Sequence, residues 1–378
     1  MRLPLLLLVP LLLAQPRARA CTIFVLTDAE RTLFFNNEDW SDPNAQLWFV
    51  PAGRDHLGCA YVGFEDGWAQ GGVNTAGLAF DWVAHPEVAY TPDPVLTQVR
   101  GNSAQRMLEV CTTVDEAVAF YRAHREVEFA RGRILIADRT GASVIIGVHD
   151  GALRFARDDR SRGFGFGAEV LQRRLADSPE ATLAHGAAIL WACAQSGDTP
   201  TQYANVFDLR RGEITLYPTP ARDDAVRFDL AAELEHGGRA YAIRDLAAAP
   251  TAGARPLSPA QQRFYLDTFT ELPDVTAAVG PRLIRVLTDA AAGGMREADY
   301  TPALWSELAH VQTELRGQLA PLGPLSGLTV VAHATEHGSH VYRCLVRFTK
   351  ARVLQRYTLD SDGLIAAVAT EFVELERP

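Results

Sequence analysis

Three pairs of short apolar segments, each joined by a polar turn, constrain the fold of this chain more than any other feature. β-Branched and aromatic residues fill segments 21–27 and 33–35, which flank the polar turn 28–32. The same pattern recurs at 134–137 with 143–146, and at 203–209 with 213–217. Such pairs predict antiparallel hairpins. Similar runs predict further strands at 47–50, 60–63 and 78–83.

Two helices are expected among these strands. Thr113 and Glu116 form a capping box, which predicts a helix that begins there. Ser178 followed by Pro179 predicts the start of a second helix, which would continue to about residue 193. Strands and helices in this order predict an α+β fold, with antiparallel sheets and segregated helices.

A second domain is expected after a linker at 247–257, which is rich in Ala, Pro and Gly. Segments 259–270 and 302–319 predict helices. Four runs predict strands of a sheet with one solvated face, at 328–335, 341–349, 353–359 and 364–372. His333, His337 and His340 lie close in sequence around a turn, but no carboxylate or Cys joins them at ligand spacing, so a solvated loop is favoured over a metal site.

Residues 1–20 have the pattern of a secretory signal peptide. Arg2 precedes an apolar stretch of about a dozen residues, too short to span a bilayer comfortably, and Ala18 and Ala20 form a cleavage site. The sequence therefore predicts export to the periplasm or the medium, without a transmembrane segment, and a mature chain that begins at Cys21. Two alternatives stay open. In the first, Cys21 is acylated as a lipoprotein anchor, although Arg19 does not match the small residue that lipoprotein processing prefers at its position. In the second, Cys21 has no special role.

Composition excludes one large class of function. The formal net charge is −10 from 36 basic and 46 acidic residues, and removal of the three arginines in 1–20 would make it −13. A chain this acidic is not suited to binding nucleic acid, which requires Lys and Arg to displace phosphate counterions. The four cysteines after Cys21 are widely spaced without a CxxC, so zinc binding is not expected. Disulfides and buried thiols both remain open for them.

An N-terminal cysteine carries a nucleophile and a base on one residue. The α-amine has a pKa of about 7.7–8.0 and can take the thiol proton near neutral pH. The first hairpin would bring segment 36–40 back beside Cys21, where Asp39 could orient the amine. The alternative for Asn36 and Asn37 is an ordinary turn at a strand end.

Three motifs together resemble the linear amide C–N hydrolases. They are Cys21-Thr22, the Asn-Asn-Glu-Asp-Trp segment at 36–40, and the Gly-Gly-Val-Asn-Thr-Ala-Gly-Leu-Ala-Phe-Asp-Trp segment at 71–82. Segments 137–143, 201–208 and 216–217 also resemble this group of N-terminal-nucleophile (Ntn) hydrolases. The group includes penicillin V acylases, choloylglycine hydrolases and isopenicillin N acyltransferase relatives. The resemblance covers about residues 21–245 and implies an αββα sandwich with the nucleophile on its first strand.

The resemblance also implies roles for individual residues. Cys21 matches the nucleophile, Asp39 matches the aspartate that contacts the N-terminal group, and Asn74 belongs to a turn beside the site. A backbone N–H within 81–84 would serve the oxyanion hole, which places Asp81 at the site. Phe80 and Trp82 would line an acyl pocket, the alternative being ordinary core aromatics.

Two departures from the pattern affect the expected mechanism. Asn36 stands where bile-salt hydrolases have Arg, and Arg173 or Arg174 is a candidate for a later arginine of the family. No Asn lies between Asn102 and Asn205, although many members take an oxyanion donor from that stretch. Losing one such donor typically costs about 10²–10³ in rate. Three alternatives stay open: a backbone N–H of the glycine-rich loop 161–168, near Gly163, substitutes for it, or the enzyme is slow, or it is not an amidase of the usual kind.

The expected function is hydrolysis of a linear amide in a small N-acyl compound, through an acyl-enzyme and without a metal or other cofactor. Acyl transfer on the same scaffold is the near alternative. A catalytically weak binding protein, lipid-anchored through Cys21, is the distant one. The second domain resembles cystatin-like or NTF2-like accessory domains only vaguely. It would pack beside the catalytic domain or mediate assembly of identical copies.

Overall fold

The computed structural model describes residues 21–99, 101–177, 180–219, 224–247, 253–262, 265–266 and 269–375. The predicted signal peptide, the Ser178-Pro179 helix start and residues 248–252 of the expected linker lie outside these ranges. The chain divides into two compact units, Met1–Leu257 and Ser258–Pro378. Each unit has its own sheet system and core.

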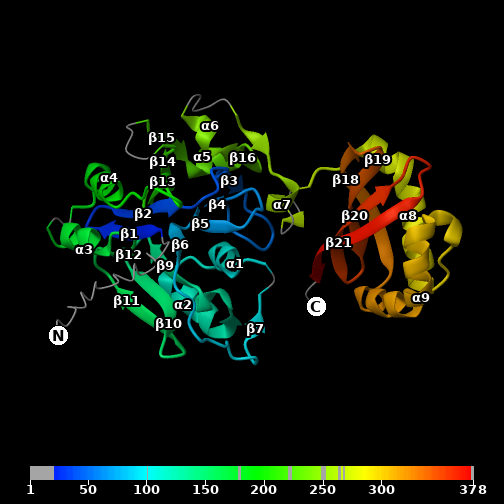
Figure 1. Ribbon diagram of the computed structural model, residues 1–378, viewed down its shortest axis with the longest axis horizontal. Coiled ribbons are helices and arrows are strands. Elements are labelled where there is room, and N and C mark those ends of the chain that lie inside the picture. Colours follow the sequence, from blue (N-terminus) through cyan, green and yellow to red (C-terminus); the bar gives the residue numbers. More distant parts are fainter. Residues whose placement is uncertain are drawn as a thin grey trace, which may run out of the picture. The chain divides into compact units, whose positions relative to one another are not determined.

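The first unit contains two large antiparallel sheets (Figure 1). The six-stranded sheet has the order β12-β1-β2-β13-β14-β15, and the nine-stranded sheet has the order β11-β10-β9-β6-β5-β4-β3-β16-β17. All three predicted hairpins are confirmed: β1 pairs with β2, β9 with β10, and β13 with β14. The strands of the smaller sheet are β1 Thr22–Thr27, β2 Thr32–Asp39, β12 Arg162–Gly165, β13 Thr201–Asp208, β14 Glu213–Tyr217 and β15 Val226–Asp229.

The larger sheet includes every other strand predicted in this unit, and several that the sequence did not indicate. Its strands are β3 Gln46–Val50, β4 Cys59–Gly63, β5 Ala69–Asn74, β6 Leu78–Ala84, β9 Gly132–Asp138, β10 Ser143–His149, β11 Ala152–Asp158, β16 Arg239–Ala242 and β17 Arg255–Pro256. A separate short parallel pair is formed by β7 Thr97–Gln98 and β8 His124–Arg125.

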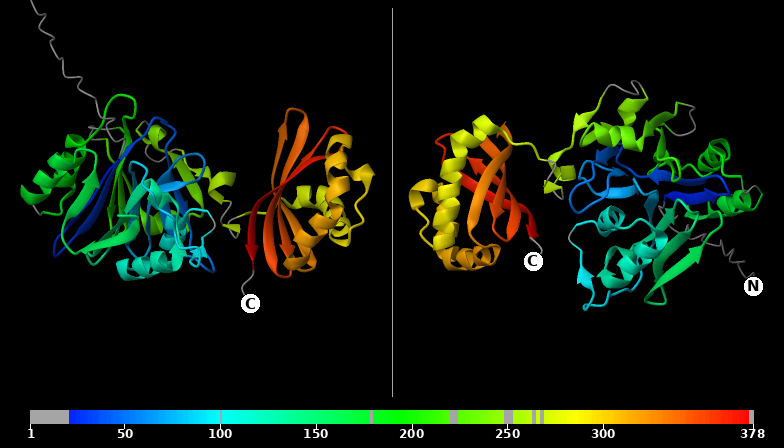
Figure 2. Two further views of the ribbon diagram at one scale, coloured as in Figure 1. Left: turned by 60° about the horizontal axis from the view of Figure 1, so that its bottom comes forward. Right: turned by 180° about the vertical axis from the view of Figure 1, so that it is seen from behind.

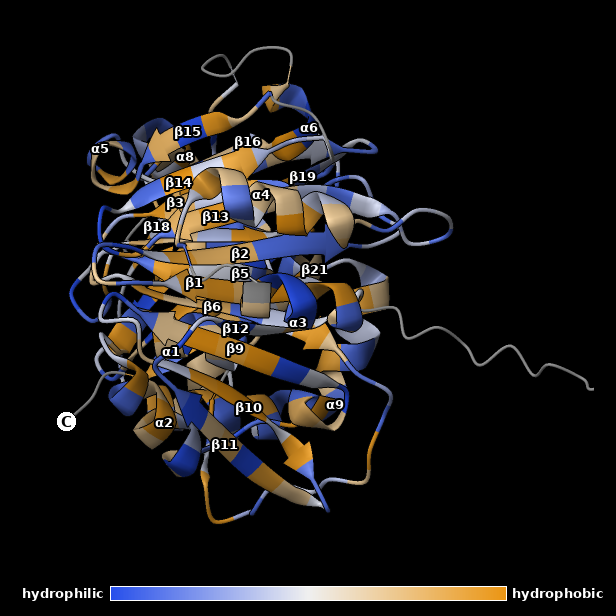
Figure 3. Ribbon diagram, turned by 90° about the vertical axis from the view of Figure 1, so that its left-hand side faces the viewer, coloured by the Kyte–Doolittle hydropathy of each residue, from blue (hydrophilic) through white to orange (hydrophobic). Residues whose placement is uncertain are grey.

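The two sheets pack face to face, and helices cover their outer faces. Ile23, Val25 and Phe34 of the smaller sheet share one core with Leu47 and Val62 of the larger sheet. The opposite face of β1 and β2 packs against α3 Ala168–Asp177 and α4 Leu183–Ala192, which lie in front of it in Figure 3. Helices α1 Ser103–Val110 and α2 Val114–Ala123 contact β5, β6, β9 and β10. The expected αββα arrangement is therefore confirmed by the packing of this chain.

The capping signals predicted the start of one helix correctly and misplaced the start of another. Thr113 caps α2 as predicted, since its side chain accepts from Glu116 N. The helix predicted from Ser178 is α4, which Thr182 caps instead by accepting from His185 N. Helices α1 and α3 were not predicted, and the short helices α5 Leu230–Glu235, α6 Ile243–Leu246 and η1 Glu128–Ala130 complete the unit.

The glycine-rich stretch near Gly163 is a strand, which corrects the predicted loop. It forms β12 and pairs with β1 from Val25↔Arg162 to Thr22↔Gly165. A Cβ at Gly163 would lie 2.3 Å from the Cβ of Phe24. The glycines therefore permit close contact between two strands.

The second unit is an antiparallel sheet in the order β18-β19-β20-β21, with α8 and α9 beside it (Figure 2). All four predicted strands are present, as β18 Leu325–Glu336, β19 Ser339–Phe348, β20 Ala351–Leu359 and β21 Ile365–Leu375. Helix α9, Pro302–Leu319, has the predicted bounds, and short turns η3 Glu297–Asp299 and η4 Ala320–Leu322 flank it. Only α7 Pro259–Gln262 represents the helix expected over 259–270 among the described residues.

Helix α8, Pro273–Ala292, was missed because Gly280 and Pro281 lie in its middle. A proline there usually breaks a helix, since it lacks an N–H and clashes with the preceding turn. Burial of Leu283, Val286 and Leu287 against the sheet compensates for that cost.

Side-chain contacts answer one question that the sequence left open. All five cysteines are free and buried, so the buried-thiol alternative holds. The expected loop is wrong for two of the histidines, since His333 lies in β18 and His340 in β19, where their rings stack with 3.1 Å between ring nitrogens. No group of three or more potential metal ligands occurs in the described ranges. Within those ranges, no helix is long and apolar enough to cross a membrane.

Candidate active site

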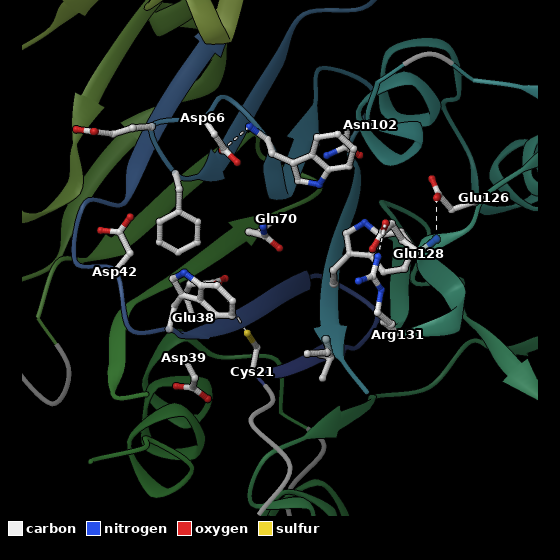
Figure 4. A pocket seen from close by; sticks show the side chains of 18 residues that line it. Cys21, Glu38, Asp39, Asp42, Asp66, Gln70, Asn102, Glu126, Glu128 and Arg131 are labelled. Atoms are coloured by element: carbon white, nitrogen blue, oxygen red, sulfur yellow. Dashed lines mark hydrogen bonds and ion pairs between the residues drawn. The ribbon is translucent and has the colours of Figure 1, made fainter. Parts of the chain in front are cut away.

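Cys21 lies on the floor of a cavity of about 530 Å³ in the first unit (Figure 4). The lining comes from Cys21 directly before β1, from β2, β5 and β6, from the segments that follow β2 and β4, from the N-cap of α1, and from residues 126–132. Trp40, Phe64, Trp68 and Trp82 supply aromatic surface. The Cys21 thiol therefore faces a pocket large enough for a small organic ligand.

The strand register places Glu38 opposite the candidate nucleophile. β1 pairs with β2 from Thr27↔Thr32 to Thr22↔Asn37, and the next pair in this register is Cys21 with Glu38. Tyr203 of β13 lies opposite Glu38 on its other side. Cys21 Sγ lies 3.7 Å from Glu38 Oε1, within range of a weak S–H donor.

Glu38 is almost completely buried, at 3% exposure, and is weakly partnered. Besides the thiol, Asn36 Nδ2 approaches Glu38 Oε2 at 3.4 Å, and the Tyr203 hydroxyl lies close enough to lower the pKa of Glu38. Burial raises the pKa of Glu38 to about 7, and the neighbouring Asp39 adds to the rise. The carboxyl group can therefore gain or lose a proton near neutral pH.

Asp39 also lines the cavity but has stronger hydrogen-bond partners. Thr201 Oγ1 donates to its Oδ1 at 2.5 Å, and Gln195 Nε2 donates to its Oδ2 at 2.6 Å. Burial raises the pKa of Asp39 to about 6, although these two hydrogen bonds oppose the rise. The side chain is thereby held in one orientation beside Cys21.

A third carboxyl group, that of Asp81, lies behind Glu38. Asp81 is fully buried on β6, and neither of its oxygens has a hydrogen-bond partner among the described residues. A Cβ at Gly71 would lie 2.1 Å from Asp81 Oδ2, so only glycine leaves room for this carboxyl group. Burial raises the pKa of Asp81 well above its ordinary value, and Glu38 adds to the rise.

These surroundings oppose ionisation of the thiol. Burial raises the pKa of Cys21 well above its ordinary value, and the charges of Glu38 and Asp39 raise it further. Because the thiolate is the reactive form, attack on a substrate requires a group that removes the proton during the step. Glu38 is positioned to do so.

The β5–β6 ladder ends before β6 itself does. β6 pairs with β9 up to Ala84↔Gly132, but its pairs with β5 run only from Val73↔Ala79 to Gly71↔Asp81. Beyond that point Asn102 Nδ2 donates to Ala69 O at 2.8 Å, and residues 82–84 line the cavity. This strand segment, which the resemblance implied for the oxyanion hole, thus borders the cavity.

The structure brings some of the predicted site residues together and leaves others apart. Cys21, Asp39 and Trp82 line the cavity, with Asn36 and Asp81 bordering Glu38. Phe80, although fully buried, is not part of the lining, and neither is Gly163. Asn74 holds the β5–β6 turn, and Arg174 is exposed on α3.

Sequence reasoning missed Glu38, although it lies inside the Asn-Asn-Glu-Asp-Trp motif at 36–40. The predicted turn 28–32 is one residue longer than the turn in the structure, where β2 begins at Thr32. A shift of one residue exchanges the faces of a strand. It also changes which residue of β2 lies opposite Cys21. A prediction with the correct turn length would have placed Glu38 there.

Comparisons with known proteins give solved structures at low identity. Penicillin V acylase from Agrobacterium tumefaciens is 16% identical, with a TM-score of 0.48, over 59% of this chain and 91% of that chain. Two variants of conjugated bile acid hydrolase from Clostridium perfringens are 17% and 16% identical, with TM-scores of 0.49 and 0.48, over 59% of this chain and 96% of theirs. These are enzymes of the group that the sequence motifs resemble. No protein-family model and no curated protein matches the chain.

Proposed function

We propose that this chain is a cysteine amide hydrolase of the Ntn type, which cleaves the linear amide bond of a small N-acyl compound. The observation that carries the proposal is the Cys21 thiol on the cavity floor, with Glu38 Oε1 at 3.7 Å. A buried thiol beside a carboxyl group of raised pKa, in a cavity, is the arrangement expected for nucleophilic catalysis.

The reaction would proceed through an acyl-enzyme. Cys21 Sγ attacks the amide carbon as its proton leaves, and a tetrahedral oxyanion forms. The C–N bond then breaks as the proton passes to the departing amine, which leaves a thioester on Sγ. Water, deprotonated by the same base, attacks the thioester and releases the carboxylic acid and the free thiol.

Two groups can accept the thiol proton. One is the Glu38 carboxylate, directly across from Cys21. The other is the α-amine that Cys21 would carry once residues 1–20 are removed, with Asp39 beside it. Backbone N–H groups within 82–84, at the end of the β5–β6 ladder, are the proposed oxyanion donors.

The proposal includes export and removal of residues 1–20. Intact mass of the protein recovered from its exporting host tests this step directly. A chain that begins at unmodified Cys21 supports the mechanism. A diacylglyceryl group on Cys21 would block the thiol and identify a lipoprotein instead.

Turnover of N-acyl amides by the wild type, Cys21→Ala and Cys21→Ser tests the chemistry. Wild-type protein should release amine, and Cys21→Ala should release none. Full activity in Cys21→Ala would refute the mechanism. Diversion of the acyl group to an added amine would identify an acyltransferase, and one acylation event per chain without turnover would identify a binding protein.

A further inference from the structure

We propose that the substrate carries a cationic group, which an acidic and aromatic wall of the Cys21 cavity binds. This inference rests on the proposed function, because it names the substrate class of the same cavity. The class is an N-acyl amine that has a second, protonated amine within a few bonds of the amide.

The cavity carries a large excess of negative charge. Seven carboxyl side chains line it, against one basic side chain among the described residues. That one, Arg131, already pairs with Glu128 at 3.3 Å. A cavity walled by charge of one sign concentrates ligands of the opposite sign.

Several of these carboxylates are available to a ligand. Asp42 Oδ1 accepts from Asn44 N, and Asp66 Oδ1 accepts from Trp68 N, which occupies one oxygen of each. In the described part of the chain, neither Asp42 nor Asp66 forms an ion pair with Lys or Arg, and the same holds for Glu65. Their charge is therefore not neutralised by the protein.

An exposed aromatic surface adjoins these carboxylates. Trp40 is 48% exposed, and among the described residues it is the one aromatic side chain of that exposure. Its ring centroid lies 6.2 Å from that of Phe64, with the planes tilted by 42°. Exposed aromatic faces attract ammonium groups through their π-electrons, so the rings and carboxylates favour the same ligand.

The positions of these groups predict how a bound substrate is oriented in the cavity. Asp42 and Asp66 lie on one side of the cavity in Figure 4, whereas Glu126, Glu128 and Arg131 lie on the other. Cys21 lies between them on the floor. A substrate with its carbonyl carbon at Sγ would extend its cationic end toward Asp42 and Asp66. A substrate with a free carboxylate would be repelled from that wall.

A charge series of substrates tests this inference. The probes share a phenylacetyl group and a four-carbon amine: N-phenylacetyl-1,4-diaminobutane is cationic, N-butylphenylacetamide is neutral, and N-phenylacetyl-4-aminobutanoate is anionic. We expect kcat/KM for the cation to exceed that of the neutral probe by about tenfold at low salt, and the anion to be poorest. The ratio should shrink as salt screens the wall. A neutral probe equal to or better than the cation would overturn the inference and leave the proposed hydrolase standing.

A second arm locates the cation and separates the two proposals. N-butyl-6-aminohexanamide carries the ammonium on the acyl side, so its rank against the diamine probe shows which side faces the wall. Affinity of the same probes for Cys21→Ala, measured by calorimetry, does not depend on turnover. Preference for the cations there supports the inference even if no probe is cleaved, and equal affinities overturn it.

Paired variants identify the wall itself. Asp42→Asn combined with Asp66→Asn should reduce the cation-to-neutral ratio several-fold, with little change for the neutral probe. Asp362→Asn, at an exposed turn of the second unit, is the matched control and should leave the ratio unchanged. An unchanged ratio in the double variant would place the cation elsewhere and refute the assigned wall.

Discussion

Two buried polar side chains in the first unit, Asn74 and Glu38, show opposite kinds of surroundings. Asn74 Nδ2 donates to Leu108 O and Cys111 O at 2.7 Å each, and its Oδ1 accepts from Ala76 N and Leu78 N at 3.0 Å each. Glu38 has a thiol at 3.7 Å and an amide at 3.4 Å. Both are nearly inaccessible to solvent.

The difference distinguishes a buried side chain that stabilises the fold from one that is suited to a chemical role. A buried side chain with every hydrogen bond satisfied stabilises the fold, and its removal leaves several partners unpaired. A buried carboxyl group with weak partners costs stability, and such groups are retained mainly at functional sites. Both residues lie in motifs that support the family resemblance, yet only Glu38 lines the cavity.

The largest expected effect is on catalysis by Glu38→Gln. If Glu38 accepts the thiol proton, the variant should lose about 10²–10⁴ in kcat/KM for an N-acyl amide. Wild-type kcat/KM should rise with pH and reach half its maximum near pH 7, where Glu38 ionises. That limb should be absent from the pH profile of the variant.

Glu307→Gln, on an exposed position of α9, is the matched control and should behave as wild type. Full activity of Glu38→Gln, with an unchanged pH limb, would assign the base to the α-amine alone.

The next effect is on stability, at Asn74. Asn74→Ala should lower the free energy of unfolding by about 3 kcal/mol or more, because two carbonyls and two N–H groups lose their partner. Asn74→Asp keeps the acceptor, loses both donated bonds and places a carboxylate against two carbonyl oxygens, so it should also be destabilised. Chemical denaturation measures both variants. Loss of activity without loss of stability in Asn74→Ala would instead assign this residue to the active site.

A smaller effect should appear in the pH dependence of stability. The pKa of Glu38 is about 7 in the folded chain against an ordinary value of 4.5, so the folded state holds this proton more tightly than the unfolded state. Stability from this group is then greatest below about pH 4.5 and falls as the pH rises toward 7. Glu38→Gln should therefore be more stable than wild type by about 1–3 kcal/mol at pH 8, with little difference at pH 4. Urea unfolding at the two pH values measures this, and equal stabilities at pH 8 would contradict it.

The smallest effect is expected at Arg174. Its side chain is exposed on α3 and is not part of the cavity lining. Burial raises the pKa of Cys193 to about 11, and the charge of Arg174 opposes that rise. Arg174→Gln should keep kcat/KM within about twofold, as expected of a surface charge. A loss of tenfold or more would support the role that the family resemblance implied.

Local sequence patterns were sufficient for much of the fold. The three hairpins, the Thr113 cap and the four strands of the second unit follow from alternation, turn residues and capping, which act over a few neighbouring residues. Helix α8 was not predictable in this way, because packing against its sheet outweighs the cost of Pro281. The predicted loop at Gly163 was wrong because strand β1 supplies the hydrogen bonds that make this stretch a strand.

The sequence by itself determined that Cys21 lies at the start of a hairpin, directly before its first strand, and that an acidic motif returns toward it. Which carboxyl group meets the thiol was decided only by the tertiary structure, since a one-residue change in the turn exchanges the faces of β2. The tertiary structure also decided that the cavity is acidic. Asp42, Asp66 and Glu126 are distant in sequence, and only the packing of the two sheets gathers their charges around one pocket.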